Sequence, residues 1–160
     1  MDDIKILVLE DGDEPEWIQV ESLFRKMYDH MMALGLMLPL DRDGSMKWID
    51  TARNIAGKFG KVIIAKSGDR VIAFAQGMVK FLPDYLGGHP VGVVTHVFVD
   101  QEYRSRQLGR SLVMNLEEWF RLKNVHSIEL QVISGNTDAI AFWSGLGYEE
   151  ELRQFRKILE

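Results

Sequence analysis

Residues 95–112 read THVFVDQEYRSRQLGRSL, a strand-like apolar run that passes through a basic turn into a helix. Asp100 ends the apolar run. Leu108, Leu112 and Leu116 then recur at helical spacing, so a helix is predicted to begin near Leu108. The first turn of a helix leaves backbone N–H groups without internal partners, and the aligned peptide dipoles place about +0.5 of a charge there. The stretch therefore predicts an anion-binding turn.

The side chains of this turn suit a phosphate. Gly109 lets a ligand approach the backbone closely because it has no side chain. Arg104, Arg106 and Arg110 add positive charge around the same turn. A single glycine among arginines is also common in turns that serve only packing or solubility, so the turn alone leaves both interpretations open.

A second segment, NTDAIAFWSGLGY over residues 136–148, predicts another helix with one apolar face. Together the two segments resemble the GNAT N-acetyltransferases. Arg104-x-x-Gln107-x-Gly109 is similar to the family's acyl-CoA turn, Arg/Gln-x-x-Gly-x-Gly/Ala. The second segment is similar to the family's Asn-x-x-Ala-x-x-Phe-Tyr-x-x-x-Gly-Phe. The resemblance includes specific residues over 91–148. In the N-terminal half only the order of the elements agrees with the family.

The resemblance implies that the chain uses acetyl-CoA, or another short acyl-CoA, as a co-substrate and needs no metal. The residues implied to bind it are Val97, Phe98, Val99, Arg104, Ser105, Arg106, Gln107, Leu108, Gly109, Arg110, Ser111, Asn136, Ala139 and Phe142. Gln107 stands where the family usually has its first glycine, and a residue with a Cβ is tolerated there if its φ angle is negative.

The apolar periodicity and the turn signals predict one α/β domain over residues 1–160, in the order β-α-α-β-β-β-α-β-α-β. The predicted strands cover residues 4–9, 61–65, 71–81, 91–99, 127–133 and 152–159, and the predicted helices cover 13–35, 46–59, 108–122 and a segment after Asn136. Strands 91–99 and 127–133 flank a helix and should be parallel neighbours. The resemblance implies a mixed, mostly antiparallel sheet in which this pair separates at its C-terminal ends, where the pantetheine arm enters.

The acyl-transfer chemistry needs a base, because a lysine-like amine with a pKa of ~10.4 is almost fully protonated at neutral pH. Where the family often has a glutamate, this chain has Thr95 with His96 beside it. His96 is the candidate base, and its alternative is a hydrogen-bonded histidine on the helix-covered face. Adjacent strand residues face opposite sides, so Thr95 and His96 are not expected to share one cleft.

Trp143 occupies the position of the tyrosine that protonates the leaving thiolate in many family members, and an indole N–H has no usable acidity. Tyr148 is a second candidate proton donor, or else an aromatic plug at the start of a strand. The acceptor amine is expected to meet Asp29, His30, Tyr85 and Trp143, from the regions that surround the acceptor in similar proteins.

The composition of the chain excludes several kinds of chemistry and argues against several kinds of partner. The 160 residues include no cysteine, which excludes disulfides and an acyl-cysteine intermediate. The net charge of -5 argues against a nucleic-acid partner. No apolar run approaches the ~20 residues of a membrane span, so no membrane association is expected. The acidic start MDDIKILVLEDGDEP lacks the features of a secretory signal, so a cytoplasmic location is expected.

These observations favour a cytoplasmic N-acyltransferase that moves acetyl from acetyl-CoA to a primary amine of a small molecule or protein by direct attack. The alternative is a non-catalytic acyl-CoA-binding sensor or scaffold, because the family's tyrosine and glutamate are both replaced. A homodimer is expected from the resemblance alone.

Overall fold

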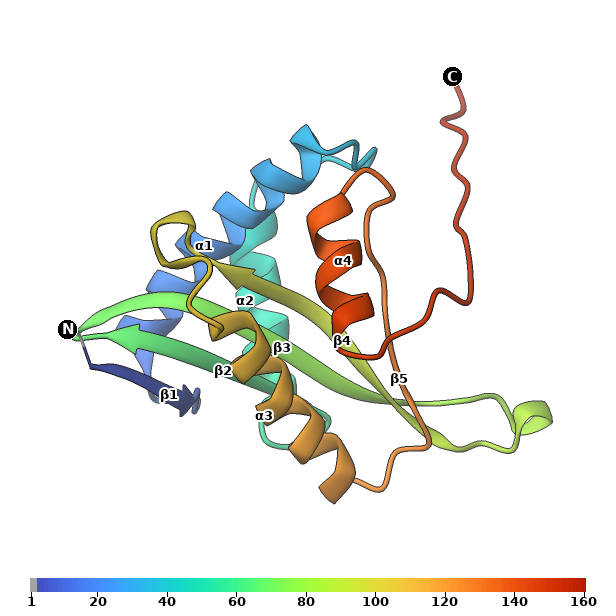
Figure 1. The fold of residues 1–160 in the computed structure, drawn as a ribbon, viewed down its shortest axis with the longest axis horizontal. Helices are drawn as coiled ribbons and strands as arrows, with labels where there is room; N and C mark the ends of the chain where they lie inside the picture. Colours follow the sequence, from blue (N-terminus) through green and yellow to red (C-terminus); the bar gives the residue numbers. More distant parts are fainter. Residues whose placement is uncertain (1–2) are drawn as a thin grey trace.

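A computed structural model describes residues 3–160 as one mixed sheet with helices on both faces (Figure 1). The strands are β1 (Ile4–Val8), β2 (Gly60–Ser67), β3 (Arg70–Phe81), β4 (Pro90–Val99) and β5 (Ile128–Leu130). The helices are α1 (Glu14–Ala33), α2 (Gly44–Ile55), α3 (Leu108–Leu122) and α4 (Thr137–Gly145), with short 3-10 turns η1 (Asp84–Leu86) and η2 (Gln101–Tyr103). No helix in the described range is long and apolar enough to cross a membrane.

The strands lie in the order β1-β2-β3-β4-β5. The first three pairings are antiparallel, and β4 pairs with β5 in parallel, from Gly92 opposite Ile128 to Val94 opposite Leu130. The predicted fold class, a mixed and mostly antiparallel sheet with one parallel pair, is confirmed. The helix predicted to begin near Leu108 begins at that residue.

Alternating side chains of the strands build two separate cores. On one face, α1 and α2 cover the sheet, and Trp17 and Phe24 pack with Phe74. On the other face, α3 buries Leu116 and Phe120 against the sheet. The helix approaches the strands closely because Gly77 and Gly92 have no side chain: a Cβ on either would lie under 3.0 Å from the Phe120 ring.

The predicted final strand, residues 152–159, is not formed. Residues 149–160 carry no regular secondary structure and extend away from the sheet (Figure 1). The predicted strand 127–133 is also shortened, to Ile128–Leu130. A strand exists only where its N–H and C=O groups pair with a neighbour, and the alternation of side chains does not reveal whether that neighbour lies within the same chain.

Replacing Gly92 should disturb the packing of α3. A Cβ on Gly92 would lie 2.7 Å from Phe120 Cδ1, so Gly92→Ala is expected to lower the free energy of unfolding by ~1–3 kcal/mol in urea denaturation. Gly12→Ala is the matched control, because a Cβ there meets no atom within 4 Å. An equal loss in both variants would contradict this account of the packing.

Candidate active site

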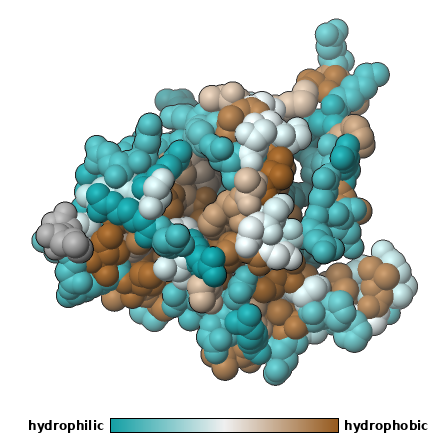
Figure 2. Space-filling model, viewed as in Figure 1, coloured by the Kyte–Doolittle hydropathy of each residue, from teal (hydrophilic) through white to brown (hydrophobic). Residues whose placement is uncertain are grey.

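The pairing of β4 with β5 stops at Val94, half-way along β4. The Asp100 N–H donates to Ile72 O on β3, so the alternate residues Val97 and Val99 turn their main-chain groups to the other, open side. A cavity of about 520 Å³ lies there, lined by β4, the following turn, the start of α3, residues 130–133 and α4. Figure 2 shows this face of the molecule hollowed over a partly apolar floor.

The turn between β4 and α3 presents free amides to this cavity. Helix α3 has no side-chain cap, and its first internal bond runs from the Ser111 N–H to Gln107 O at 3.0 Å. Within the described residues, the N–H groups of Leu108, Gly109 and Arg110 therefore have no partner. An uncapped helix N-terminus facing a cavity is suited to bind a phosphate.

The φ angle of Gln107 is not negative, so the condition for tolerating a residue with a Cβ at this position is not met. Gln107 has a φ of 63°, and Ser105 has a φ of 67°, so both occupy the left-handed region. Such backbone costs about 1–3 kcal/mol per non-glycine residue and persists only where the surroundings impose it. At Gln107 the left-handed residue turns the chain into α3 and leaves the first amides of the helix exposed to the cavity.

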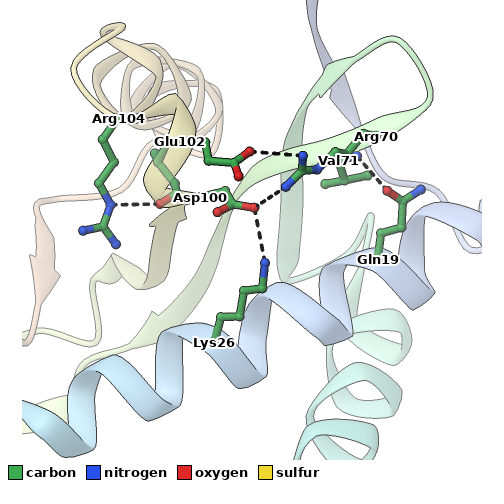
Figure 3. Close-up of polar contacts among 8 residues, drawn as sticks. Gln19, Lys26, Arg70, Val71, Asp100, Glu102 and Arg104 are labelled. Carbon is green, nitrogen blue, oxygen red and sulfur yellow. Dashed lines mark hydrogen bonds and ion pairs between the residues drawn. The ribbon is translucent and has the colours of Figure 1, made fainter.

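An ion-pair cluster anchors the strand end that leads into the turn (Figure 3). Asp100 accepts from Arg70 at 2.9 Å and from Lys26 at 3.4 Å, and Glu102 pairs with Arg70 at 3.3 Å. Burial opposes the ionisation of Asp100, but Lys26 and Arg70 outweigh it and lower the pKa of Asp100. The carboxylate thus ties β4 to both β3 and α1.

Arg104 lies along the open edge of β4. Its Nε donates to Val99 O at 3.1 Å (Figure 3). Its guanidinium stands over the Phe98 ring at 5.6 Å. Because Nε is engaged with the strand, the two terminal nitrogens remain to bind an anion. Arg104 and Arg110 both line the cavity.

Most of the predicted cofactor-binding residues line the cavity. They are Val97, Phe98, Val99, Arg104, Ser105, Gln107, Leu108, Gly109, Arg110, Asn136, Ala139 and Phe142. Arg106 and Ser111 do not line it. The Arg106 guanidinium stands over the Tyr103 ring at 5.2 Å, and the Ser111 N–H is already used inside α3.

The two sequence motifs meet at Gly109. The side chain of Asn136 caps α4 by accepting from the Ala139 N–H at 3.1 Å. Phe142 of that helix lies against Gly109, where a Cβ would meet its ring at 3.4 Å. This is a tight but not prohibitive contact, so packing alone does not require glycine here, and the open backbone suits a close-lying ligand.

A β-bulge brings both predicted catalytic residues of β4 to the cavity. Gln76 pairs with His96 while Gly77 pairs with Val94, which leaves Thr95 as an extra residue in β4. The side chains of Thr95 and His96 both reach Oε1 of Gln76, and both residues line the cavity, so the expectation that they face opposite sides is wrong. The bulge breaks the simple alternation on which that expectation rested.

Three side chains converge on Oε1 of Gln76. Thr95 Oγ1 donates to it at 2.8 Å, Trp48 Nε1 donates at 3.2 Å, and His96 Nδ1 lies 3.3 Å away. The indole N–H can only donate, so the shared atom must be the amide oxygen. The sequence analysis missed Gln76 and Trp48. The available signal was one amide inside the apolar strand 71–79, because a buried polar group needs partners.

His96 is held as a neutral imidazole. The rings of Phe24 and Trp48 lie 5.4 and 5.3 Å from it, and burial lowers the pKa of His96 to about 4. With Nδ1 donating to Gln76, the lone pair lies on Nε2, which has no hydrogen bond within residues 3–160. A neutral ring with a free lone pair can accept a proton from a ligand in the cavity.

Tyr148 is not at this site. Its hydroxyl donates to Glu117 Oε1 at 2.9 Å, on the far part of α3, and it does not line the cavity. Burial, and then the Glu117 carboxylate, raise the pKa of Tyr148. The hydroxyl is committed elsewhere, so the structure does not support Tyr148 as a proton donor.

Of the four residues predicted to meet the acceptor amine, two line the cavity and two do not. His30 and Trp143 line the cavity, whereas Asp29 and Tyr85 do not. Asp29 is an exposed residue near the end of α1, and Tyr85 is 84% exposed in η1, at the tip of the β3–β4 hairpin. Met27 and Met31 join His30 in facing the cavity. Residues 3–160 contain no group of three or more side chains placed to bind a metal.

The comparison with known proteins decides the family. The model of the Acetyltransferase (GNAT) family matches residues 21–148. The chain belongs to the GNAT acetyltransferase family. It is an N-acetyltransferase that transfers an acetyl group to an amine and uses an acyl-CoA as co-substrate. The predicted family and enzyme class are confirmed, and the non-catalytic alternative has no support.

Two curated relatives cover different shares of this GNAT chain. It is similar to the glucosamine 6-phosphate N-acetyltransferase of Trypanosoma brucei brucei, with 26% identity over 157 residues, 96% of this chain and 95% of the relative. It is also similar to the catalytic subunit of the N-terminal acetyltransferase B complex of Arabidopsis thaliana, with 34% identity over 82 residues, 51% and 45% of the two chains.

Solved structures share the GNAT fold. An aminoglycoside N-acetyltransferase in complex with CoA superimposes with a TM-score of 0.77 and 16% identity, over 98% of this chain and 96% of the other. The glucosamine-6-phosphate N-acetyltransferase of Arabidopsis thaliana gives 0.70 and 16%, over 99% of both chains.

Gly109→Asp should block cofactor binding without unfolding the protein. An acidic residue at a helix N-terminus suits the dipole, but here it repels a phosphate and occupies its place. We expect at least a ~10-fold loss of affinity for CoA by calorimetry. Gly145→Asp is the control, because a Cβ there meets nothing within 4 Å and Gly145 does not line the cavity. Equal losses in both variants would remove the turn from the binding site.

The low pKa of His96 makes the fold sensitive to acid. Between pH 6.5 and about 4, the unfolded chain binds a proton at this histidine and the folded chain does not, so stability is full above pH 6.5 and falls as the pH decreases. The total loss from His96 is about 3 kcal/mol. Denaturant titrations of His96→Gln across this range should show a shallower decline than the parent protein. Parallel pH profiles would contradict the buried, neutral state.

Proposed function

We propose that this GNAT enzyme transfers acetyl from acetyl-CoA to a primary amine of a small molecule or a protein by direct attack. The observation that carries the proposal is the opening of β4 from β5 beyond Val94, beside the uncapped start of α3. This arrangement offers an anion site and a line of unpaired main-chain groups in one cavity.

Different residues would bind different parts of the co-substrate. The amides of Leu108, Gly109 and Arg110 would hold the diphosphate, with Arg104 supplying charge-assisted bonds. The free main-chain groups of Val97 would pair with the amides of the pantetheine arm, as a neighbouring strand would. When bound, the co-substrate supplies the acyl group as a thioester.

His96 is the proposed proton acceptor. Its Nε2 carries a lone pair and needs no deprotonation at neutral pH, because its pKa is about 4. So weak a base acts only on an amine that already reaches the site uncharged, and an apolar wall favours the neutral form of an amine. Met27 and Met31 provide such a wall beside His30. Thr95 and Gln76 hold the imidazole and act as positioning residues.

The acceptor class is proposed from the relatives and the charge of the chain. The relatives named above acetylate an amino sugar phosphate, protein N-termini and aminoglycosides, all of them amines. The net charge of -5 favours a cationic acceptor and disfavours nucleic acid. We propose that the enzyme works in the cytoplasm, away from membranes, and as a homodimer.

Thiol release from acetyl-CoA tests the activity against a panel of glucosamine 6-phosphate, a peptide with a free N-terminus and an aminoglycoside. We expect turnover with at least one class, and a drop in kcat of ~10²–10⁴-fold in His96→Gln with unchanged CoA affinity. His126→Gln is the control, because His126 bonds to Ser127 outside the cavity. Unchanged kcat in His96→Gln would exclude this histidine as the base, and no turnover with any amine would overturn the proposed acceptor class.

A further inference from the structure

The cavity runs through the sheet from one face to the other. On one face it is lined by Met27, His30 and Met31 of α1, and on the other by residues of α3 and α4. The opening between β4 and β5 is therefore a passage through the sheet, here called the passage. The co-substrate is proposed to bind at its α3 end, so an acceptor amine would reach His96 from the α1 end.

A contact between two backbones closes the open side of the passage. β4 and β5 pair only as far as Val94 and Leu130. Residues 131–133 continue from β5 as one wall, and Gly135 then lies against the carbonyl of Leu34 at the C-terminal end of α1. Figure 1 shows the end of α1 beside the segment that leads into α4. The contact of Gly135 with Leu34, here called the bridge, thus bounds the passage where the two strands have separated.

The bridge forms because Gly135 has no side chain. A Cβ on Gly135 would lie 2.5 Å from Leu34 O and 3.7 Å from the carbonyl carbon. These are backbone atoms, so they cannot rotate away as the end of a flexible side chain would. The φ angle of Gly135 is not positive, so its conformation is open to other residues. The close approach to Leu34 is therefore what requires glycine at this position.

Hydrogen bonds hold the backbone on both sides of the bridge. The Leu34 N–H donates to two carbonyls in the last turn of α1, including Met31 O at 3.1 Å. The Asn136 N–H donates to Ile133 O at 2.8 Å and closes the turn that contains Gly135. Met31 and Ile133 line the passage, each within three residues of the bridge. The bridge therefore fixes the distance between the α1 wall and the wall that continues from β5.

We infer that Gly135 is a specificity-determining residue, which sets the width of the passage and so limits the bulk beside the nitrogen of the acceptor amine. This deepens the acetyl transfer proposed above and rests on it. The attacking nitrogen must come within about 3–3.5 Å of the thioester carbon, so the groups next to the nitrogen enter the passage with it. The class of acceptor that fits is a primary amine on an unbranched carbon.

Chemical modification of His96 measures this width without any turnover. Diethyl pyrocarbonate modifies a neutral imidazole, and peptide mass spectrometry reports each of the four histidines separately. We expect Gly135→Ala to raise the rate at His96 at least ~10-fold, with and without CoA, because the added methyl moves the two walls apart. His126 lies outside the cavity and should keep its rate. Gly145→Ala is the matched control, because a Cβ there meets nothing within 4 Å.

A second variant changes the other side of the bridge and replaces Gly135→Ala if that variant does not fold. Gly35 shares a peptide unit with the Leu34 carbonyl and has a φ of 110°. Gly35→Ala therefore strains the end of α1, although nothing lies within 4 Å of the added Cβ. The rate at His96 should rise at least ~3-fold in this variant, with the rate at His126 unchanged.

Two isomeric amines test the consequence for the reaction. n-Butylamine and sec-butylamine differ only in the branching of the carbon that carries the nitrogen. The parent enzyme should prefer n-butylamine, and Gly135→Ala should reduce this preference in kcat/KM at least ~10-fold with unchanged CoA affinity. A rate at His96 that does not rise in either bridge variant overturns the inference, as does a preference that Gly135→Ala leaves unaltered. A lack of turnover with every amine counts against the proposed function, and the His96 rates then still decide the inference.

Discussion

The separation of β4 from β5 beyond Val94 is the constraint on which the site depends. Main-chain groups that lose a strand partner must bond to something else, and here they face a cavity. The same opening sets the uncapped end of α3 at one side of the cavity and α4 at the other. A parallel pair that stayed closed would leave no space there, so the cavity exists because β4 and β5 separate.

Two local features set the position of the residues that line this opening. The Asp100 cluster fixes where β4 ends, and therefore where the following turn meets the cavity. The bulge at Thr95 turns two consecutive side chains toward the same space, where Gln76 holds them. The aromatic residues around His96 then lower its pKa and keep it neutral. Position and protonation state thus come from contacts between distant parts of the chain.

The elements whose signals are local were predicted well. The start of α3 at Leu108 and the cap of α4 at Asn136 are written in short motifs, and both appear where expected. The strands predicted at residues 61–65 and 71–81 also form, as the paired strands β2 and β3. The prediction from regular alternation failed in two places, at the bulge beside Thr95 and in residues 152–159. Alternation describes a strand's two faces, but it does not identify the neighbouring strand.

The sequence by itself determined the order of elements as far as α4, the family and the basic turn before α3, because each rests on residues close together in the chain. Only the tertiary structure decided which residues share the cavity. It brought Thr95, His96 and Gln76 together, placed Tyr148 beside Glu117, and left residues 152–159 without a strand partner among the described residues. These outcomes depend on packing between segments far apart in sequence, and short-range patterns do not record such packing.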